Sequence, residues 1–472
     1  MQANGYNRLG AYFMVPPDGD NGNLEYATRV LGINKFIFFA RHCQSRRKLL
    51  RLFHRLRCLC WPKSPWLAVD EEGGTVSRLA HLIGPIPSAM AVGQLAMPAQ
   101  LRLALRVSLS LKRLGFTVNL APVTDVLRRY DNSCIATRAF GYSSQNVLRG
   151  SLAVCRAAAA SGMLSCCKHF PGLGRADRDS HHALPVSVWP RRSVQVIADL
   201  LQRVNVPIIM AGHCLYPNIS RELTTFSADL LTSFLRKRMD FKGVLLSDDM
   251  LMGALQNEPV LENRFLRAWR AGIDLLLLSR LDSQVLAAIT RLTQPTYRHH
   301  LPLDHLRRAR QRLDAAAELY RHSPVPCADH TIADSQFFQL FQRAFHTGHS
   351  ARLRQGRYYL LIDARAHERC KQIPAFRNLS LRARACIRYN AHGWIGFGAR
   401  PATDPMLVVS FNPLHGPAAF CRFINQHRQF SVISLGEPHE RHLFSRAAGI
   451  LFLYSSHEAV VRNGLKQFIS WH

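Results

Sequence analysis

Side chains able to transfer protons are concentrated in one loop of this 472-residue chain. The loop begins with the basic pair Lys168-His169, continues through a turn rich in Pro and Gly, and ends with Asp179 and His181. Its glycines permit backbone angles that other residues resist, so the loop has freedom to move. A carboxylate two positions from an imidazole can orient the ring and raise its basicity. The loop therefore predicts an acid/base catalyst.

Polar side chains also follow other apolar runs of the sequence. Asp70, His213 and Asp248 each stand where a strand-like run ends, as Lys168 and His169 do. Catalytic groups of α/β barrels lie at the carboxyl ends of the strands. Several such coincidences in one chain predict that these residues meet at one face of a barrel.

The first 320 residues show a repeating alternation of strand-like and helix-like segments. The intervening helix-like stretches include 146–160, 193–203, 228–238 and 262–271. Eight strands separated by helices favour a (β/α)₈ barrel over an open doubly wound sheet. The expected strands are 10–15, 35–40, 67–70, 116–121, 163–170, 206–211, 243–248 and 274–279.

The domain boundaries follow from composition. We expect the barrel to occupy residues 1–321, closing with a basic helix over 303–320, and a Pro-containing linker to occupy 322–335. A smaller α/β, sandwich-like C-terminal domain then covers 336–472. Its expected strands are 358–362, 406–411, 430–434 and 449–453.

Composition excludes several classes of function. There is neither a secretion signal nor a long apolar run, which predicts a cytoplasmic protein with no membrane partner. No Gly-rich dinucleotide motif follows the first strand, and the histidines His169, His181 and His213 lack metal-ligand spacing. We therefore expect no cofactor and no metal.

The net charge of +30 would attract polyanions. A basic run over residues 41–57 could face phosphate, but basic residues are spread along the whole chain and no nucleic-acid motif accompanies them. The simpler interpretation is a solvated cationic surface, and nucleic acid is not expected as a partner.

Several motifs resemble those of the β-N-acetylglucosaminidases (β-hexosaminidases) of glycoside hydrolase family 3. They are Ala68-Val69-Asp70-Glu71-Glu72-Gly73-Gly74-Thr75-Val76-Ser77-Arg78, Leu120-Ala121-Pro122-Val123-Thr124-Asp125, Thr137-Arg138-Ala139-Phe140-Gly141, the 168–181 loop and Leu246-Ser247-Asp248-Asp249-Met250. Their order and spacing cover nearly the whole barrel. The Lys-His…Asp-Ser-His form resembles the N-acetylglucosaminidase branch of the family rather than its glucosidase and xylosidase branches.

The resemblance implies a retaining, two-step mechanism. Asp248 matches the family nucleophile, which attacks the anomeric carbon and forms a glycosyl-enzyme. His181 matches the general acid/base, with Asp179 as the carboxylate that orients it. Sugar-binding roles carry over to Asp70, Arg78, Arg138, Lys168, His169 and His213. Thr75 and Leu173 depart from the family pattern, since an Arg and a His are common at these positions.

Each key residue also has a structural alternative. Asp248 could cap the helix that follows it, because Asp is favoured there. His181 could belong to a surface pair with His182, and Asp70 could be an ion-pair partner in the barrel mouth. Asp125 and Asp249 are expected to be structural rather than catalytic.

The sequence therefore predicts an exo-enzyme that hydrolyses terminal β-linked N-acetylglucosamine. A peptidoglycan-derived muropeptide, recycled in the cytoplasm, is the expected substrate, because its carboxylates suit a cationic protein. Two alternatives remain open. One is a phosphorylase or transglycosylase that passes the sugar to another acceptor. The other is a non-catalytic polyanion-binding protein on a hydrolase barrel.

Overall fold

The computed structural model describes residues 5–18, 21–84, 86–128, 134–176, 178 and 183–321, together with seven strands between His346 and Phe452. The chain divides into two compact units, one containing residues 1–72, 76–84 and 96–331 and the other 73–75, 85–95 and 332–472. The boundaries expected at 321 and 336 stay a prediction.

The first unit is built on eight parallel strands whose order is β1-β8-β7-β6-β5-β4-β3-β2. A parallel bridge between Val15 and Phe36 joins the two ends of this order and completes the ring. The predicted barrel is thus confirmed, and a strand overlaps each of the eight expected ranges, although residues 10–12 of the first range belong to a 3-10 helix. The strands are β1 (Phe13–Met14), β2 (Lys35–Phe38), β3 (Trp66–Val69), β4 (Val118–Asn119), β5 (Leu164–Phe170), β6 (Ile208–Ala211), β7 (Val244–Asp249) and β8 (Leu275–Leu277).

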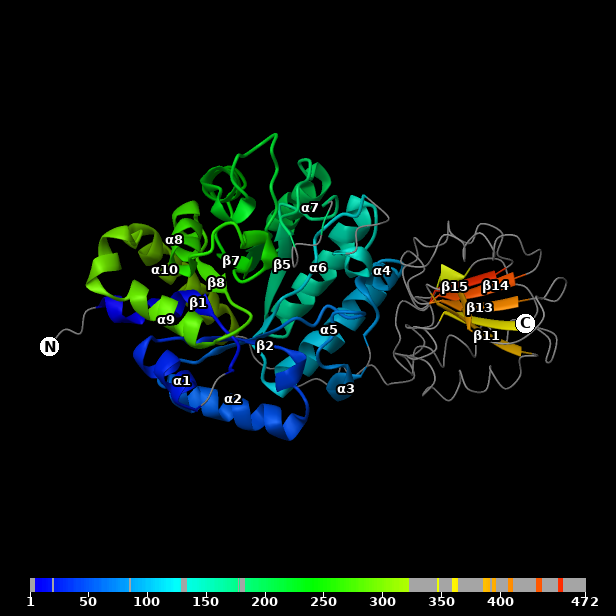
Figure 1. The fold of residues 1–472 in the computed structure, drawn as a ribbon, viewed down its shortest axis with the longest axis horizontal. Helices are drawn as coiled ribbons and strands as arrows, with labels where there is room; N and C mark the ends of the chain where they lie inside the picture. Colours follow the sequence, from blue (N-terminus) through cyan, green and yellow to red (C-terminus); the bar gives the residue numbers. More distant parts are fainter. Residues whose placement is uncertain are drawn as a thin grey trace. The chain divides into compact units, whose positions relative to one another are not determined.

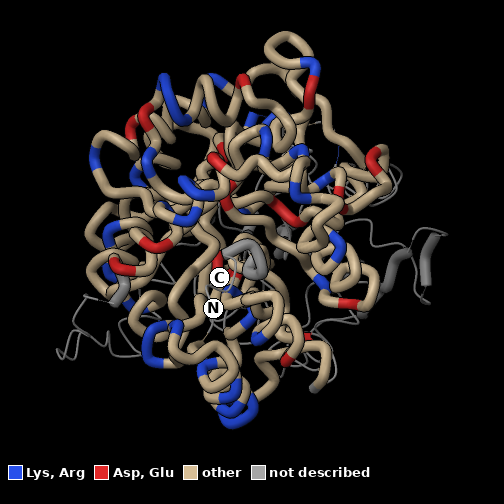
Figure 2. Tube along the Cα trace, turned by 90° about the vertical axis from the view of Figure 1, so that its left-hand side faces the viewer, with Lys and Arg blue, Asp and Glu red and all other residues tan. Residues whose placement is uncertain are grey.

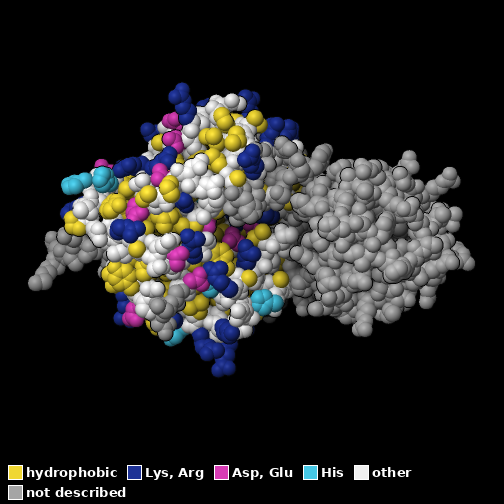
Figure 3. Space-filling view, in the orientation of Figure 1, with side chains coloured by type: hydrophobic (Ala, Val, Ile, Leu, Met, Phe, Trp, Pro, Cys, Tyr) yellow, Lys and Arg dark blue, Asp and Glu magenta, His cyan; other side chains and the backbone are white. Residues whose placement is uncertain are grey.

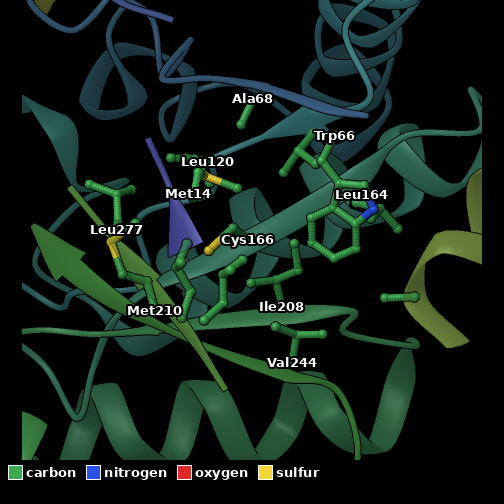
Figure 4. Packing of buried hydrophobic residues seen from close by; sticks show 14 of the residues in the cluster. Met14, Trp66, Ala68, Leu120, Leu164, Cys166, Ile208, Met210, Val244 and Leu277 are labelled. Atoms are coloured by element: carbon green, nitrogen blue, oxygen red, sulfur yellow. The ribbon is translucent and has the colours of Figure 1, made fainter. Parts of the chain in front are cut away.

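Alternate residues of these strands fill the interior of the barrel. Successive side chains of a strand point to opposite faces, so residues two apart share one face. Ile208 and Met210 of β6 lie in one buried cluster with Val244 and Leu246 of β7. Figure 4 shows members of this cluster, among them Ile208, Met210 and Val244, converging from several strands. The interior of the barrel is therefore a packed core, and the polar side chains of the candidate site lie at the strand ends.

The helices surround this ring, as Figure 1 shows. Several begin at residues whose side chains satisfy the first free amides: Ser143 accepts from the amide of Asn146, and Asp282 from that of Val285. The main helices are α2 (Arg46–Cys60), α5 (Met97–Leu114), α6 (Ser144–Ala160), α7 (Arg191–Arg203), η6 (Asp229–Arg238), α8 (Leu261–Ala271), α9 (Ser283–Leu292) and α10 (Leu303–Arg321).

Shorter helical segments lie in the connections. They are η1 (Gly5–Tyr12), α1 (Asn21–Glu25), η2 (Tyr26–Val30), η3 (Ala40–His42), α3 (Ala80–Ile83), α4 (Ala89–Val92), η4 (Ala136–Arg138), η5 (Thr224–Phe226), η7 (Gly253–Leu255) and η8 (Pro295–His300). All five helices expected from the sequence are present, although η6 has π-helical rather than α-helical hydrogen bonding. Among the described residues, no helix is both long enough and apolar enough to cross a membrane.

The described part of the second unit comprises residues 73–75 and 86–95, which include α4, and a seven-stranded sheet. Its order is β12-β11-β10-β13-β14-β15-β9, with parallel pairing except at the two edge strands. All four strands expected here are present, and three more were not anticipated. The strands are β9 (His346–Thr347), β10 (Tyr359–Asp363), β11 (Ala385–Asn390), β12 (Gly393–Ile395), β13 (Met406–Ser410), β14 (Phe430–Ser434) and β15 (Gly449–Phe452).

Candidate functional site

A cavity of about 340 Å³ lies at the carboxyl ends of the barrel strands. This volume is near the lower end of the range for small-molecule pockets, which favours one sugar ring over a long glycan. Six of the nine predicted site residues line the cavity: Asp70, Arg78, Arg138, Lys168, His169 and Asp248. Folding therefore brings Asp70 and Asp248, which are 178 positions apart in the sequence, to one site.

Four of the charged groups at this site form a continuous ionic network. The Lys168 Nζ donates to Asp70 Oδ1 at 2.7 Å and lies 2.6 Å from Glu72 Oε1. Arg138 donates to both carboxylate oxygens of Glu72, each at 2.9 Å. Asp70 follows β3, Lys168 lies in β5, and Arg138 ends η4, so the network fixes three separate segments against one another.

Burial and neighbouring charge act in opposite directions on this network. Burial alone would raise the pKa of Glu72, but Arg138 and Lys168 outweigh it and hold that pKa well below its ordinary value. Burial would likewise lower the pKa of Lys168, whereas Asp70 and Glu72 raise it above the ordinary value. Both groups therefore stay charged at neutral pH and present fixed charges to a ligand.

His169 is held in a defined tautomer. Its Nδ1 lies 2.9 Å from Asp125 Oδ2, and its Nε2 lies 3.4 Å from Arg138 Nη2. Because a carboxylate only accepts and a guanidinium only donates, the ring proton belongs on Nδ1. The other Asp125 oxygen accepts from the amide of Leu173. Asp125 is fully buried, and it anchors both the end of β5 and the start of the following loop.

Asp248 lies in β7 and lines the cavity beside Asp249. The Asp248 Oδ1 accepts from the amide of Asp249 at 2.8 Å, and Asp249 Oδ1 accepts from the amides of Leu251 and Ser279. Burial raises the pKa of Asp249, and these hydrogen bonds only partly offset it. Asp249 is thus bound to backbone amides that shape the turn, which is a structural role.

His213 lies two residues after β6 and is fully buried. Its Nε2 donates to the carbonyl oxygen of Asp249 at 2.9 Å, and its Nδ1 lies 2.6 Å from the Thr225 hydroxyl. Burial lowers the pKa of His213, so the ring is neutral at pH 7. It is not among the described residues that line the cavity, and the predicted sugar contact of His213 stays a prediction.

Arg78 is positioned through the backbone of its own loop. Glu71 Oε2 accepts from the amides of Arg78 and Leu79, both at 2.9 Å. The Glu71 backbone is in turn bound on both sides by the side-chain amide of Asn119. This buried Glu71 therefore holds the turn from which Arg78 reaches the cavity.

Asp179 and His181 lie outside the described residues. Their acid/base roles stay predictions, and the structure describes the loop from Phe170 to Ala176 that leads to them. Tyr216 donates to the Gly172 carbonyl oxygen at 2.6 Å within this described part.

Glu72 was not predicted to be a site residue, and Asp125 was expected to have only a structural role. Glu72 stands two positions after Asp70, and alternate residues of an extended segment face the same side, which was an available signal. Asp125 gave no comparable signal, because its partners are 44 and 48 positions away in the sequence.

The arrangement has a defined chemical capacity. Fixed cations and carboxylates line a small cavity, where they can donate to and accept from the hydroxyl and carbonyl groups of a sugar. Asp248 supplies a carboxylate at the same cavity that can attack an electrophilic carbon. A bound sugar can thus be oriented by the ionic network and attacked from β7.

Comparison with known proteins identifies similar sequences and folds. The sequence profile of the "Glycosyl hydrolase family 3 N terminal domain" matches residues 32–315. A "Beta-hexosaminidase" of Bordetella pertussis is 32% identical over 264 residues, which cover 52% of this chain and 73% of that protein.

Two solved structures extend the likeness to the whole chain. A family 3 β-N-acetylglucosaminidase of Paenibacillus sp. FPU-7 has a TM-score of 0.82 at 18% identity and covers 98% of this chain and 95% of its own. A multi-domain fungal family 3 β-N-acetylglucosaminidase has a TM-score of 0.85 at 20% identity and covers 99% of this chain, which spans 59% of that longer protein. These two likenesses concern the fold.

Proposed function

Because the chain belongs to glycoside hydrolase family 3, we propose that it is a retaining exo-β-N-acetylglucosaminidase. Family membership makes it a glycoside hydrolase, and the Bordetella β-hexosaminidase supports the acetamido sugar as the group removed. The observation that carries the proposal is the location of Asp248 in the same cavity as the Asp70–Lys168–Glu72–Arg138 network.

The proposed reaction has two steps. In the first, an Asp248 oxygen bonds to the anomeric carbon while the bond from that carbon to the leaving oxygen breaks, and His181 gives its proton to that oxygen. In the second, water attacks the same carbon, gives a proton back to His181, and releases Asp248. Asp179 orients His181 and stabilises its charged form, so the two act as an acid/base dyad.

The described groups bind the sugar in this scheme. Asp70 accepts hydrogen bonds from ring hydroxyls, while Arg78, Arg138, Lys168 and His169 surround the same ring. The hydrogen bonds of the network hold these charges in place, which limits the rearrangement that binding of the substrate requires.

We also propose a muropeptide derived from peptidoglycan as the natural substrate. Its support is electrostatic, since a chain of net charge +30 attracts carboxylated fragments over some distance. The cytoplasmic location expected from the sequence stays a prediction.

The first test compares an aryl β-N-acetylglucosaminide with the matching β-glucoside. Asp248→Ala should lower kcat on the acetamido substrate by about 10³-fold or more, because the nucleophile is lost. Azide should then restore turnover and give the α-glycosyl azide, since it attacks where the carboxylate stood. The exposed Asp240→Asn is the matched carboxylate control.

Other results would redirect the assignment. A preference for the glucoside moves the chain to another branch of the family. Glycosyl phosphate as the main product in phosphate buffer makes it a phosphorylase. A folded enzyme inactive on both glycosides would leave the polyanion-binding alternative.

The assigned role of His181 predicts a dependence on the leaving group. His181→Ala should reduce turnover of alkyl glycosides by about 10²–10⁴-fold and of activated aryl glycosides far less, because only a poor leaving group needs a proton. Rates measured across a series of leaving groups of different pKa check this. Equal losses across the series would contradict the acid role.

A further inference from the structure

A second hollow of about 690 Å³ lies beside the loops that build the catalytic cavity. Four arginines line it: Arg128 after β4, Arg175 in the loop after β5, and Arg191 and Arg192 at the start of α7. Trp189 and Ile219 contribute apolar surface between them. We call this set of six residues the arginine groove.

The charge of the arginine groove is uncompensated among the described residues. All four arginines are exposed, and none of their side chains forms a hydrogen bond or ion pair with another described residue. No described residue lining the groove is an Asp or a Glu. The cations of the catalytic cavity differ, because Arg138 and Lys168 are both paired with carboxylates.

The walls of the groove are fixed to one another by hydrogen bonds. The Val126 amide donates to Ser193 Oγ at 2.9 Å, and the Arg128 amide donates to the Gly174 carbonyl oxygen at 3.0 Å. Trp189 packs edge-on against Tyr216 with ring centroids 5.8 Å apart. The backbone that carries the groove is therefore held in place, which lowers part of the entropic cost of binding a ligand.

The groove and the catalytic cavity share two segments of chain. Leu173 lines the cavity, and Arg175 lines the groove two residues later. Asp125 binds His169 and Leu173 at the cavity, and Val126 and Arg128 follow directly in the groove. The chain that continues from Arg175 leads to Asp179 and His181, which serve the leaving-group side in the proposed function.

We propose that the arginine groove binds a carboxylate on the aglycone of the substrate, the part released after bond cleavage. This inference rests on the proposed function and extends it to the leaving-group side. Guanidinium groups bind carboxylates through paired, charge-assisted hydrogen bonds, and the indole of Trp189 can cover an apolar sugar face. A neutral aglycone would gain none of these charged contacts.

The test uses two substrates that differ in one charge. They are N-acetylglucosamine β-linked to N-acetylmuramic acid, and the methyl ester of the same disaccharide. At a fixed ionic strength of about 0.15 M, attraction between exposed charges more than about 8 Å apart is largely screened, while contacts at hydrogen-bond distance remain. Under this condition the wild type should prefer the acid in kcat/KM by about tenfold. This preference should appear mainly in KM.

Replacing all four arginines by Gln should bring the ratio of acid to ester to about one. The double variant Arg191→Gln/Arg192→Gln is the milder form and should lower the ratio in part. The matched control replaces Arg46, Arg47, Lys48 and Arg51, four exposed cations of α2, by Gln and should keep the wild-type ratio. It removes the same net charge from a helix that contributes none of the described residues lining the groove or the catalytic cavity.

Two results would overturn the proposal. One is an unchanged ratio in the fourfold groove variant, and the other is an equal loss of preference in the α2 control, which would assign the effect to net charge. In the first case, loss of single-stranded DNA binding by the same variant would identify the groove as a general polyanion surface.

Failure of the proposed function is recognised separately. If the wild type hydrolyses neither the ester nor an aryl N-acetylglucosaminide, the enzymatic assignment falls. Calorimetric titration with free N-acetylmuramic acid then tests the groove alone. Binding that is lost in the groove variant supports it, and absence of binding to the wild type overturns it.

Discussion

At the scale of single residues, Glu72 and Glu71 show how position decides the state of a carboxyl. Glu72 is buried between two cations, and its pKa lies below the ordinary value. Its neighbour Glu71 is buried among backbone amides and forms no ion pair with another described residue, and burial raises the pKa of Glu71 to about 7. Adjacent residues of one type thus give one permanent charge and one titratable group.

The raised pKa of Glu71 predicts a pH-dependent stability. The folded pKa of about 7 exceeds the ordinary 4.5, so the unfolded chain releases this proton first. The contribution of Glu71 to stability is then complete below about pH 4.5 and is lost as pH rises through 7. Glu71→Gln cannot ionise and should raise the free energy of unfolding by up to about 3 kcal/mol at pH 8.

Urea unfolding at pH 4.5 and pH 8 measures this difference. The gain of Glu71→Gln over wild type should be larger at pH 8, while Glu25→Gln, at a half-exposed position paired with Arg29, should show little change between the two values. An equal effect of Glu71→Gln at both pH values would mean that Glu71 does not titrate in this range.

The individual roles in the site could be anticipated only in part from the sequence. Asp70, Lys168, Arg138 and Asp248 were identified as site residues from motifs, and they line one cavity. An ion pair was an expected alternative role for Asp70. The structure shows Asp70 both paired with Lys168 and lining the cavity. Partners such as Asp125 and His169 depend on folding, because they are distant along the chain.

At the scale of elements, the loop after β5 depends on close backbone approach. A Cβ atom at Gly174 would lie 2.0 Å from the Val126 carbonyl oxygen and 2.7 Å from its carbon. Both contacts are with backbone, which cannot rotate away as a side chain could. The loop therefore needs Gly at this position for packing against the segment after β4.

Gly174→Ala should displace the loop that leads to Asp179 and His181. We expect kcat/KM for an aryl N-acetylglucosaminide to fall about 10²-fold, because small displacements of catalytic groups are costly. Steady-state kinetics measures this, with circular dichroism to check that the barrel stays folded. Ala176→Gly alters the same loop without adding an atom and should cost much less. Equal losses of kcat/KM in both variants would indicate that the loop has become more flexible rather than displaced.

Strand positions were predictable because alternation and apolar runs are local signals. The ends of the strands were less predictable. For example, β4 is confined to Val118–Asn119 within the expected range 116–121. Hydrogen bonding to neighbouring strands decides where a strand ends, and that pairing is not visible locally. The same reason explains the three unpredicted strands β9, β11 and β12.

At the scale of the whole molecule, the dominant property is the net charge of +30. Figure 2 shows Lys and Arg distributed around the circumference of the barrel, and Figure 3 shows them scattered over the visible described face. This distribution gives a long-range attraction for anions without defining one binding surface. The arginine groove is distinguished by its hollow shape and its lack of a described acidic partner.

Such a long-range field predicts a salt dependence that differs between substrates. Raising the ionic strength from about 0.01 to 0.3 M should lower kcat/KM several-fold for the disaccharide acid, because screening shortens the range of attraction. The methyl ester should change less than about twofold and serves as the control. Parallel initial-rate measurements check this. Equal salt dependence for acid and ester would show that net charge does not recruit the substrate.

The sequence by itself determined the barrel, the order of its strands along the chain, and the motifs that bear the site residues. Those features are encoded locally, by the period of apolar residues and by short spacings such as Asp179 to His181. Only the tertiary structure placed Asp70 against Lys168, 98 positions away, and gathered Arg128, Arg175, Arg191 and Arg192 around one hollow. Ring closure juxtaposes the carboxyl ends of separate strands, and no local pattern specifies which side chains then meet.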